Sequence, residues 1–332
     1  MKTRSFLQFV GPSVALMLAL MALPLAITFY LSVRNCALEM EVVTVQQSGP
    51  FGTQEVVTQR ARTGPDGEAL RSCRFVGAEY FRKVLGLDGT DAAAAAPPDS
   101  GPAVENEFWA ALRFTLIYTV STTPFVLGLG LLLALGANQL TQRLKAAFIT
   151  LSLLPFIITP VVGALSIKWL FRDDGLVPSL LSNIGVNVHW MAQAWSAQLL
   201  IVLYGVWHVV PFAFIVFYAG LQSVPQDSLE AATIDGATRW QKLRFVTLPH
   251  LQPLIVFVTL IHLMDAYRVF EPVLVLTQGA FTTSVQYLTY HILLQENNPY
   301  KASAAAVLTV LGILVLLIPL LVKTWREQRQ GF

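Results

Sequence analysis

The chain has 332 residues, of which 55% are hydrophobic and only 13% are charged, with a formal net charge of +2. Its mean hydropathy is +0.59, far above that of an ordinary soluble domain. This balance excludes a typical soluble enzyme, and we expect a lipid bilayer around the protein and no nucleic-acid partner.

Six segments of the chain are long and apolar enough to cross a bilayer, which takes ~20 apolar residues in a helix. They predict an all-α membrane protein with transmembrane helices at residues 6–31, 114–137, 147–170, 196–221, 253–276 and 302–322. The first segment has a basic start like a signal peptide. It is too long for one and lacks a small-residue cleavage pattern after Tyr30, so we expect it to be retained.

Lysines and arginines near the helix ends indicate which side faces the cytoplasm, because short cytoplasmic loops are enriched in them. Ten basic residues near the ends of the predicted helices and in the short loops fall on one side of the predicted bundle: Lys2, Arg4, Arg143, Lys145, Arg239, Lys242, Arg244, Lys323, Arg326 and Arg329. Both termini are therefore predicted to be cytoplasmic. The predicted division is a first helix at 1–31, an extracytoplasmic loop at 32–113, a core at 114–323 and a cytoplasmic tail at 324–332.

The long outer loop contains two segments rich in β-branched residues, Val42–Val45 and Glu55–Arg62, around a turn-forming stretch at 48–52. This pattern favours a hairpin. The alanine run and paired prolines of Asp91–Pro102 are typical of a linker.

Both cysteines, Cys36 and Cys73, lie in the outer loop. An oxidising compartment allows a disulfide between them, and neither has the companion His or Cys of a zinc site. Two free, buried thiols are the alternative. We favour the disulfide, and we expect no metal site on this chain.

A small, polar and partly basic segment, Glu230–Pro253, separates two long apolar ones. Pro225 and Asp227 predict a helix start, and we expect Glu230 and Asp235 at the positive end of the helix dipole. Gly236 allows a sharp bend or a close backbone approach, and small alanines leave a flat surface for a partner. An ordinary basic loop is the alternative. The residues expected to contact a partner are Glu230, Ala231, Ala232, Asp235, Gly236 and Ala237.

The fifth apolar segment has an unusual number of ionisable residues: His262, Asp265, Arg268 and Glu271. Charge in hydrocarbon costs at least ~2.5 kcal/mol, so such residues are functional candidates. A rise of ~1.5 Å per residue puts Asp265 roughly 18 Å from the start of the helix, near the midplane. Arg268 can pair with either carboxylate on one helix face, which allows a purely structural network.

His262, Asp265 and Val269 share one stripe of that helix. A carboxylate and an imidazole suit the hydroxyls of a sugar or polyol. Aromatic and polar residues of the fourth segment are expected to face the stripe and to line a substrate pathway with it, although packing is the alternative for each: Tyr204, Trp207, His208 and Phe212.

The segment Glu230–Pro253 resembles the EAA loop of binding-protein-dependent ABC importers. It matches the pattern of EAA, then DGA three residues on, then an aromatic residue and an LP pair. Phe75–Phe81 and Ala304–Ala306 are similar to sugar permeases of the maltose and glycerol-phosphate type, and Asp265–Phe270 to trehalose-type members. At Leu276–Phe281 the chain departs from the usual glycine-rich turn, so the outer contact with a binding protein is expected to differ.

The resemblance implies a type I ABC importer permease, the first of two permease partners, with an outer loop insertion and a coupling loop at 222–252. It implies a second permease, two ATP-binding subunits and an extracytoplasmic solute-binding protein in a bacterial inner membrane. The chain has no GxxxxGK[ST] phosphate loop, so it is expected to be no enzyme and to carry no cofactor. ATP and Mg²⁺ are expected on the partner ATPases.

The resemblance implies import of a sugar or related polyol or osmolyte, and the trehalose-like stretch favours a disaccharide. A glycerol-phosphate permease is the nearest alternative. A secondary transporter would need no docking loop, and a membrane enzyme would need a nucleophile or metal-ligand set at a recognised spacing.

Overall fold

The computed structural model describes residues 3–38, 40–49, 52–62, 71–87, 106–185 and 187–330. The chain divides into two compact units. Unit 1 comprises residues 1–100 with 292–308, and unit 2 comprises residues 101–291 with 309–332. The predicted linker at 91–102 lies outside the described residues.

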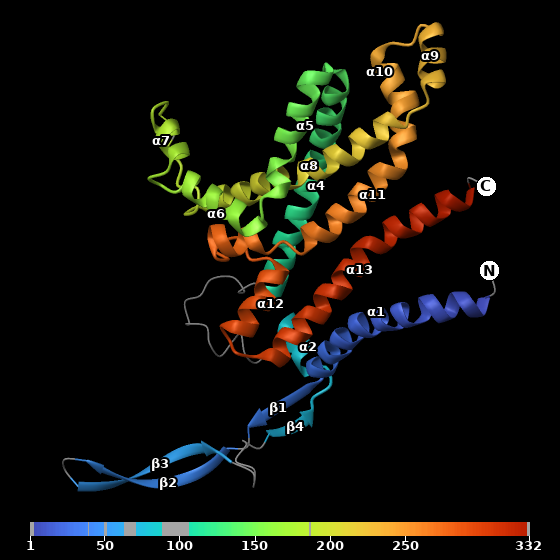
Figure 1. Ribbon diagram of the computed structural model, residues 1–332. Helices are drawn as coiled ribbons and strands as arrows, with labels where there is room; N and C mark the ends of the chain where they lie inside the picture. Colours follow the sequence, from blue (N-terminus) through green and yellow to red (C-terminus); the bar gives the residue numbers. More distant parts are fainter. Residues whose placement is uncertain are drawn as a thin grey trace. The chain divides into compact units, whose positions relative to one another are not determined.

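Unit 1 begins with the long helix α1 (Thr3–Ser32), followed by two antiparallel strand pairs. Strand β1 (Arg34–Leu38) pairs with β4 (Arg71–Phe75), and β2 (Met40–Gly49) pairs with β3 (Gly52–Ala61). The β2–β3 pair lies where the sequence favours a hairpin (Figure 1). The β1–β4 pair was not foreseen, because its strands are short and far apart in the sequence.

The β1–β4 register sets Cys36 directly opposite Cys73, and the two residues form a disulfide. The short helix α2 (Glu79–Leu85) follows. The Tyr80 ring stacks on the Tyr300 ring at 6.2 Å between centroids. The Tyr300 hydroxyl donates a hydrogen bond of 2.9 Å to the Cys36 carbonyl, so residues at the start of the last helix hold the strand pair.

Unit 2 is helical, and α13 (Pro299–Gln330) runs from unit 1 into it. Its other α-helices are α4 (Glu107–Gln139), α5 (Gln142–Ile157), α6 (Pro160–Phe171), α7 (Leu176–Ser182), α8 (Ala194–Gln222), α9 (Gln226–Ile234), α10 (Arg239–Lys242), α11 (Leu248–Tyr267) and α12 (Val285–Leu294). Two π-helical turns, η1 (Leu243–Thr247) and η2 (Val273–Thr277), flank α11.

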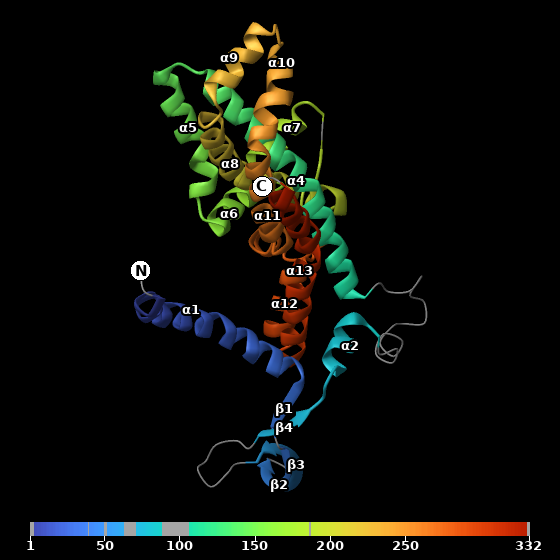
Figure 2. The ribbon, with the colours of Figure 1, turned by 90° about the vertical axis from the view of Figure 1, so that its right-hand side faces the viewer.

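Helices α4, α8 and α11 pack on one another and form the core of unit 2 (Figures 1 and 2). Gly130 of α4 lies against Ala213 of α8, where an added Cβ would come within 2.6 Å of the alanine Cβ. Small residues at such a crossing let the two backbones approach closely, as in many membrane helix pairs. Helix α8 also packs on α11.

Within the described part of the chain, five helices are long and apolar enough to cross a membrane, and a bent helix pair makes a possible sixth. The expectation of one straight helix at 147–170 is wrong, because α5 and α6 meet at a bend of 95°. Pro160 has no N–H to donate, and its ring disfavours helical geometry in the preceding residue. Thr159 is accordingly extended, with ψ of 142°.

The fifth predicted segment, 253–276, is also not one helix, since α11 ends at Tyr267 and η2 begins at Val273. Pro272 is compatible with the break, because it stands in the first turn of the next helical segment, where a missing N–H costs no helical hydrogen bond. The break turns residues 268–272 out of the α11 register, and these residues line the cavity described next.

Candidate transport cavity and coupling loop

Unit 2 contains a cavity of about 480 Å³, within the range of small-molecule sites. Six of the seven residues expected to line a substrate pathway lie on its wall: Tyr204, His208, Phe212, His262, Asp265 and Val269. Trp207, which was expected to face the same stripe, is not among the lining residues. The wall also includes Tyr118, Phe156, Pro160, Phe270, Glu271 and Gln286.

Tyr204 and His208 lie one turn apart on α8, with their rings stacked 5.7 Å apart and nearly parallel. The Tyr204 hydroxyl donates to the Pro160 carbonyl at 2.7 Å. The His208 Nδ1 lies 2.9 Å from the Pro155 carbonyl, which can only accept, so this nitrogen carries the proton. Both side chains therefore stabilise the α5–α6 bend. In the neutral ring the His208 Nε2 is an acceptor.

His262 of α11 is 2% exposed, and its Nε2 lies 3.1 Å from the Thr122 Oγ1 of α4. The Thr122 hydroxyl donates to the Tyr118 carbonyl at 2.9 Å, so its oxygen is left to accept from the His262 Nε2–H. The His262 Nδ1 is then an acceptor, and it has no partner in the described residues. A buried polar atom without a partner is unusual and marks a place where a water or a ligand hydroxyl would be bound favourably.

Asp265 and Arg268 form an ion pair of 3.1 Å, as the i, i+3 spacing predicts. The Asp265 and Arg268 side chains are 53% and 54% exposed in this chain. Among the described residues no ion pair joins Arg268 to Glu271. The break after Tyr267 ends the shared helix face on which that second pair depended.

Phe156 of α5 is a wall residue that sequence reasoning missed. Its ring stacks on Phe212 at 5.9 Å between centroids and lies 6.1 Å from His208. No periodicity within α5 points to this role, because the bend at Ile158–Thr159 is what brings Phe156 and Pro160 together at the cavity.

The expected coupling loop at 222–252 contains α9, α10 and η1. Helix α9 ends in a Schellman motif, in which the Gly236 N–H donates to the Thr233 carbonyl at 3.1 Å and the Ala237 N–H to the Ala232 carbonyl at 2.9 Å. Gly236 has φ of +74°, a conformation that glycine adopts without steric cost. Asp235 caps the carboxyl end of α9, so its expected place at the positive end of the helix dipole is wrong.

A capping box between Thr238 and Gln241 starts α10, and the Lys242 Nζ donates to the Thr233 Oγ1 at 2.7 Å. The loop is thereby held in one conformation by its own hydrogen bonds. Three large apolar side chains nevertheless remain outside: Ile234, Trp240 and Phe245 are 86%, 64% and 69% exposed. Glu230 and Ala231 are also exposed, whereas Ala232 and Ala237 are half-buried.

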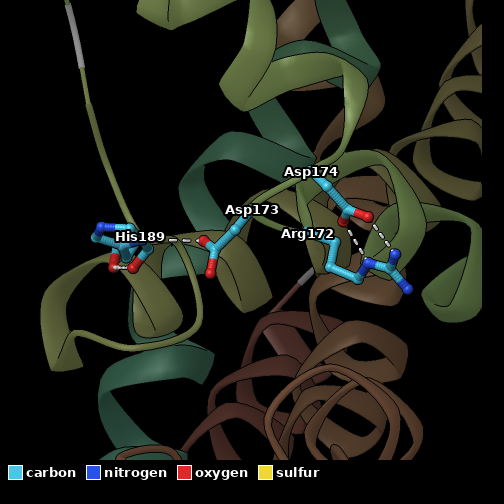
Figure 3. A network of polar contacts seen from close by, with 5 residues as sticks. Arg172, Asp173, Asp174 and His189 are labelled. Carbon is cyan, nitrogen blue, oxygen red and sulfur yellow. Dashed lines mark hydrogen bonds and ion pairs between the residues drawn. The ribbon is translucent and has the colours of Figure 1, made fainter.

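The turn between α6 and α7 carries a second polar network (Figure 3). Arg172 binds Asp174 through two nitrogens, and the Asp173 Oδ1 lies 3.1 Å from the His189 Nδ1. All four side chains are largely exposed, so the network stabilises the turn only modestly. No group of three His, Cys, Asp or Glu side chains in the part of the chain that the structure describes is arranged to hold a metal ion.

Residues 102–331 match the family described as "Binding-protein-dependent transport system inner membrane component". The chain belongs to this family. The permease is 33% identical over 231 residues to the trehalose transport system permease protein SugA of Mycobacterium tuberculosis, covering 69% of this chain and 73% of that protein. It is 32% identical over 219 residues to the arabinooligosaccharides transport system permease protein AraP of Halalkalibacterium halodurans, covering 64% of this chain and 69% of that protein.

A solved structure of a bacterial alginate ABC transporter, in complex with an alginate pentasaccharide-bound periplasmic protein, has the same fold. Its TM-score is 0.61 at 26% identity, covering 73% of this chain and 83% of that chain. The fold class and the resemblance stated from the sequence are thereby confirmed. The permease is an inner-membrane transport subunit and not an enzyme, because the family consists of transport components.

Proposed function

We propose that this chain is the permease subunit of an ATP-driven importer for a sugar or related polyol, and that the cavity in unit 2 is part of its translocation site. The observation that carries the proposal is the composition of the cavity wall. Aromatic rings from α4, α5 and α8 share it with His208, His262, Asp265 and Gln286. Flat apolar faces beside hydrogen-bonding groups are what a sugar ring, with its apolar faces and polar rim, requires.

The acceptor atoms of the wall suit hydroxyl groups in particular. The His262 Nδ1 has no partner in the described residues, and the neutral His208 ring leaves Nε2 as an acceptor. A solute hydroxyl can donate to the His208 Nε2, whereas the buried His262 Nδ1 suits a bound water beside the cavity. Named solutes of the relatives, trehalose and arabinooligosaccharides, belong to this chemical class. We propose a disaccharide such as trehalose as the first solute to test.

The coupling loop is the proposed contact with the ATP-binding subunits. Its large apolar side chains Ile234, Trp240 and Phe245 are exposed, and exposed apolar side chains that gather on one segment commonly mark protein interfaces. A second permease, two ATPases with ATP and Mg²⁺, and a solute-binding protein complete the proposed importer. Binding of ATP would shift the permease between outward and inward access by favouring one of the two states.

A glycerol-phosphate permease remains the second candidate. An anionic ligand needs a cation on the wall, and Arg268 is the only Lys or Arg side chain among the lining residues. Its guanidinium is already paired with Asp265. The structure therefore favours the sugar or polyol.

The test is trehalose uptake and trehalose-stimulated ATP hydrolysis in proteoliposomes holding the full complex. Phe212→Ala removes a wall ring and should raise the KM for uptake about tenfold, as loss of roughly 1.4 kcal/mol of ring contact would. Phe257→Ala, which truncates an exposed phenylalanine of α11 outside the wall, is the matched control. Equal kinetics of the two variants would count against the cavity as the site.

A further inference from the structure

The cavity wall has an unbalanced charge among its described residues. Its described ionisable residues, apart from two histidines and the tyrosines, are Asp265, Arg268 and Glu271. Asp265 and Arg268 neutralise each other in their ion pair. Glu271 has no ion pair or hydrogen bond with another described residue, so with neutral histidines the wall carries one net negative charge.

The position of Glu271 follows from the break in the fifth segment. Because α11 ends at Tyr267, Glu271 lies outside its register, at the start of the helical turn that leads into η2, and on the cavity wall. Glu271 shares that wall with Tyr118 of α4 and with Tyr204 and His208 of α8. Its charge therefore acts across the cavity, from α4 to α8.

We propose that Glu271 is a specificity-determining residue that excludes anionic solutes from the cavity and leaves it to uncharged, hydroxyl-rich ones. This inference rests on the proposed function, since it concerns which sugars the site accepts. A carboxylate at the edge of a partly apolar cavity repels a uronic acid or sugar phosphate at short range, where screening by salt is weak. A neutral disaccharide meets no such repulsion and finds in Glu271 another hydroxyl acceptor.

The charge of the cavity can be measured without knowing the solute. The only two cysteines of the chain are joined in a disulfide, so Val209→Cys places one reactive thiol on the cavity wall. In the assembled complex, cationic and anionic methanethiosulfonate reagents of similar size are compared. Mass spectrometry of this subunit measures the rate at which each reagent modifies the introduced thiol. That rate is divided by the rate at which the same reagent modifies a free thiol in solution.

We expect the normalised cation-to-anion ratio to exceed one. A unit charge ~10 Å from a thiol in water changes the local concentration of a monovalent ion about twofold, and so the ratio about fourfold. Glu271→Gln should lower the ratio by about this factor. Arg268→Gln should raise it, which keeps the proposal testable if one variant assembles poorly. Glu107→Gln, the same change on α4 outside the wall, should leave the ratio unchanged.

A ratio near one, or the same ratio in the parent and both wall variants, overturns the role of Glu271. Protection of the thiol from labelling by a bound solute is a separate measurement. It distinguishes a wrong role for Glu271 from a wrong proposed function. Trehalose should slow labelling in the parent, and glucuronate should do so only in the Glu271→Gln variant. Absence of protection by trehalose would count against the sugar site itself, whatever the charge ratio. If glucuronate slowed labelling equally in the parent and in the Glu271→Gln variant, the proposal that Glu271 excludes anionic solutes would be overturned.

Discussion

The Tyr204 hydroxyl of α8 donates a hydrogen bond of 2.7 Å to the carbonyl of Pro160, the first residue of α6. The bond spans the point at which the α5–α6 pair turns by 95°. Pro160 is the first residue of α6, so this bond attaches the start of α6 to α8 in a region where no water competes for the carbonyl. Tyr204 therefore both lines the cavity and stabilises the bend that forms part of its wall.

Tyr204→Phe should loosen this bend while keeping the ring in the cavity. The loss of one hydrogen bond, about 1 kcal/mol, should speed amide exchange about fivefold at Val161–Ala164, where the carbonyl is released. Hydrogen exchange with mass spectrometry of the complex measures the effect. Tyr290→Phe is the control, because the Tyr290 hydroxyl has no hydrogen bond within the described residues. Equal exchange in the two variants would show that the bend does not depend on Tyr204.

Helical spacing was sufficient to predict which residues share a wall when their helix is continuous there. Tyr204, His208 and Phe212 recur at intervals of four on α8, and His262 and Asp265 lie one turn apart on α11. All five line the cavity. Their place on one wall followed from local periodicity, which does not depend on the rest of the fold.

The two breaks could not be predicted from proline alone. Pro124, Pro211 and Pro253 all lie inside helices that continue through them, whereas Pro160 and Pro272 coincide with breaks. Neighbouring helices and side chains decide which free carbonyl groups are satisfied, and these tertiary contacts are not encoded locally. The pairing of the strands that carry Cys36 and Cys73 is likewise not encoded locally, because the two cysteines are 37 residues apart in the sequence.

The backbone at Gly236 predicts how the coupling loop responds to substitution. A Cβ there would meet no atom within 4 Å in this chain, so the cost of a side chain comes from the positive φ. Gly236→Leu should be strained by about 1–2 kcal/mol and should lose solute-stimulated ATP hydrolysis. Gly236→Asn should retain most of it, since asparagine tolerates this conformation. ATPase assays on complexes matched for subunit content make the comparison, and full activity of Gly236→Leu would contradict the docking role.

Trp240 should be required for coupling and not for folding. Its side chain is 64% exposed in this chain, so Trp240→Ala should change the stability of the subunit by less than about 0.5 kcal/mol. The same change should reduce co-purification of the ATPase subunits or their stimulation by solute. Trp195→Ala, at a similarly exposed tryptophan at the start of α8, should do neither. Identical behaviour of the two variants would remove Trp240 from the proposed contact.

The Cys36–Cys73 disulfide should be found by mass spectrometry of unreduced peptides from the outer loop. Closing a loop of this length, with a sequence separation of 37, should stabilise the strand region by about 4 kcal/mol in the chain-entropy model. Cys36→Ala should therefore make residues 34–75 more sensitive to protease, while solute-independent ATPase activity stays unchanged. Two thiols that react with an alkylating reagent before reduction would show that the bond does not form in the native protein.

Asp265 should be needed for uptake more than for assembly. Because its pair with Arg268 is half exposed in this chain, loss of one partner should cost no more than about 1 kcal/mol of stability. Asp265→Ala should thus reduce trehalose uptake with little change in complex yield or in solute affinity of the separate binding protein. Glu79→Ala removes an exposed carboxylate from another ion pair, with Lys83, and should leave uptake intact.

If Asp265 only neutralised Arg268, Asp265→Ala combined with Arg268→Ala would restore uptake. We expect no such restoration, because the carboxylate on the cavity wall would still be missing as an acceptor for solute hydroxyls.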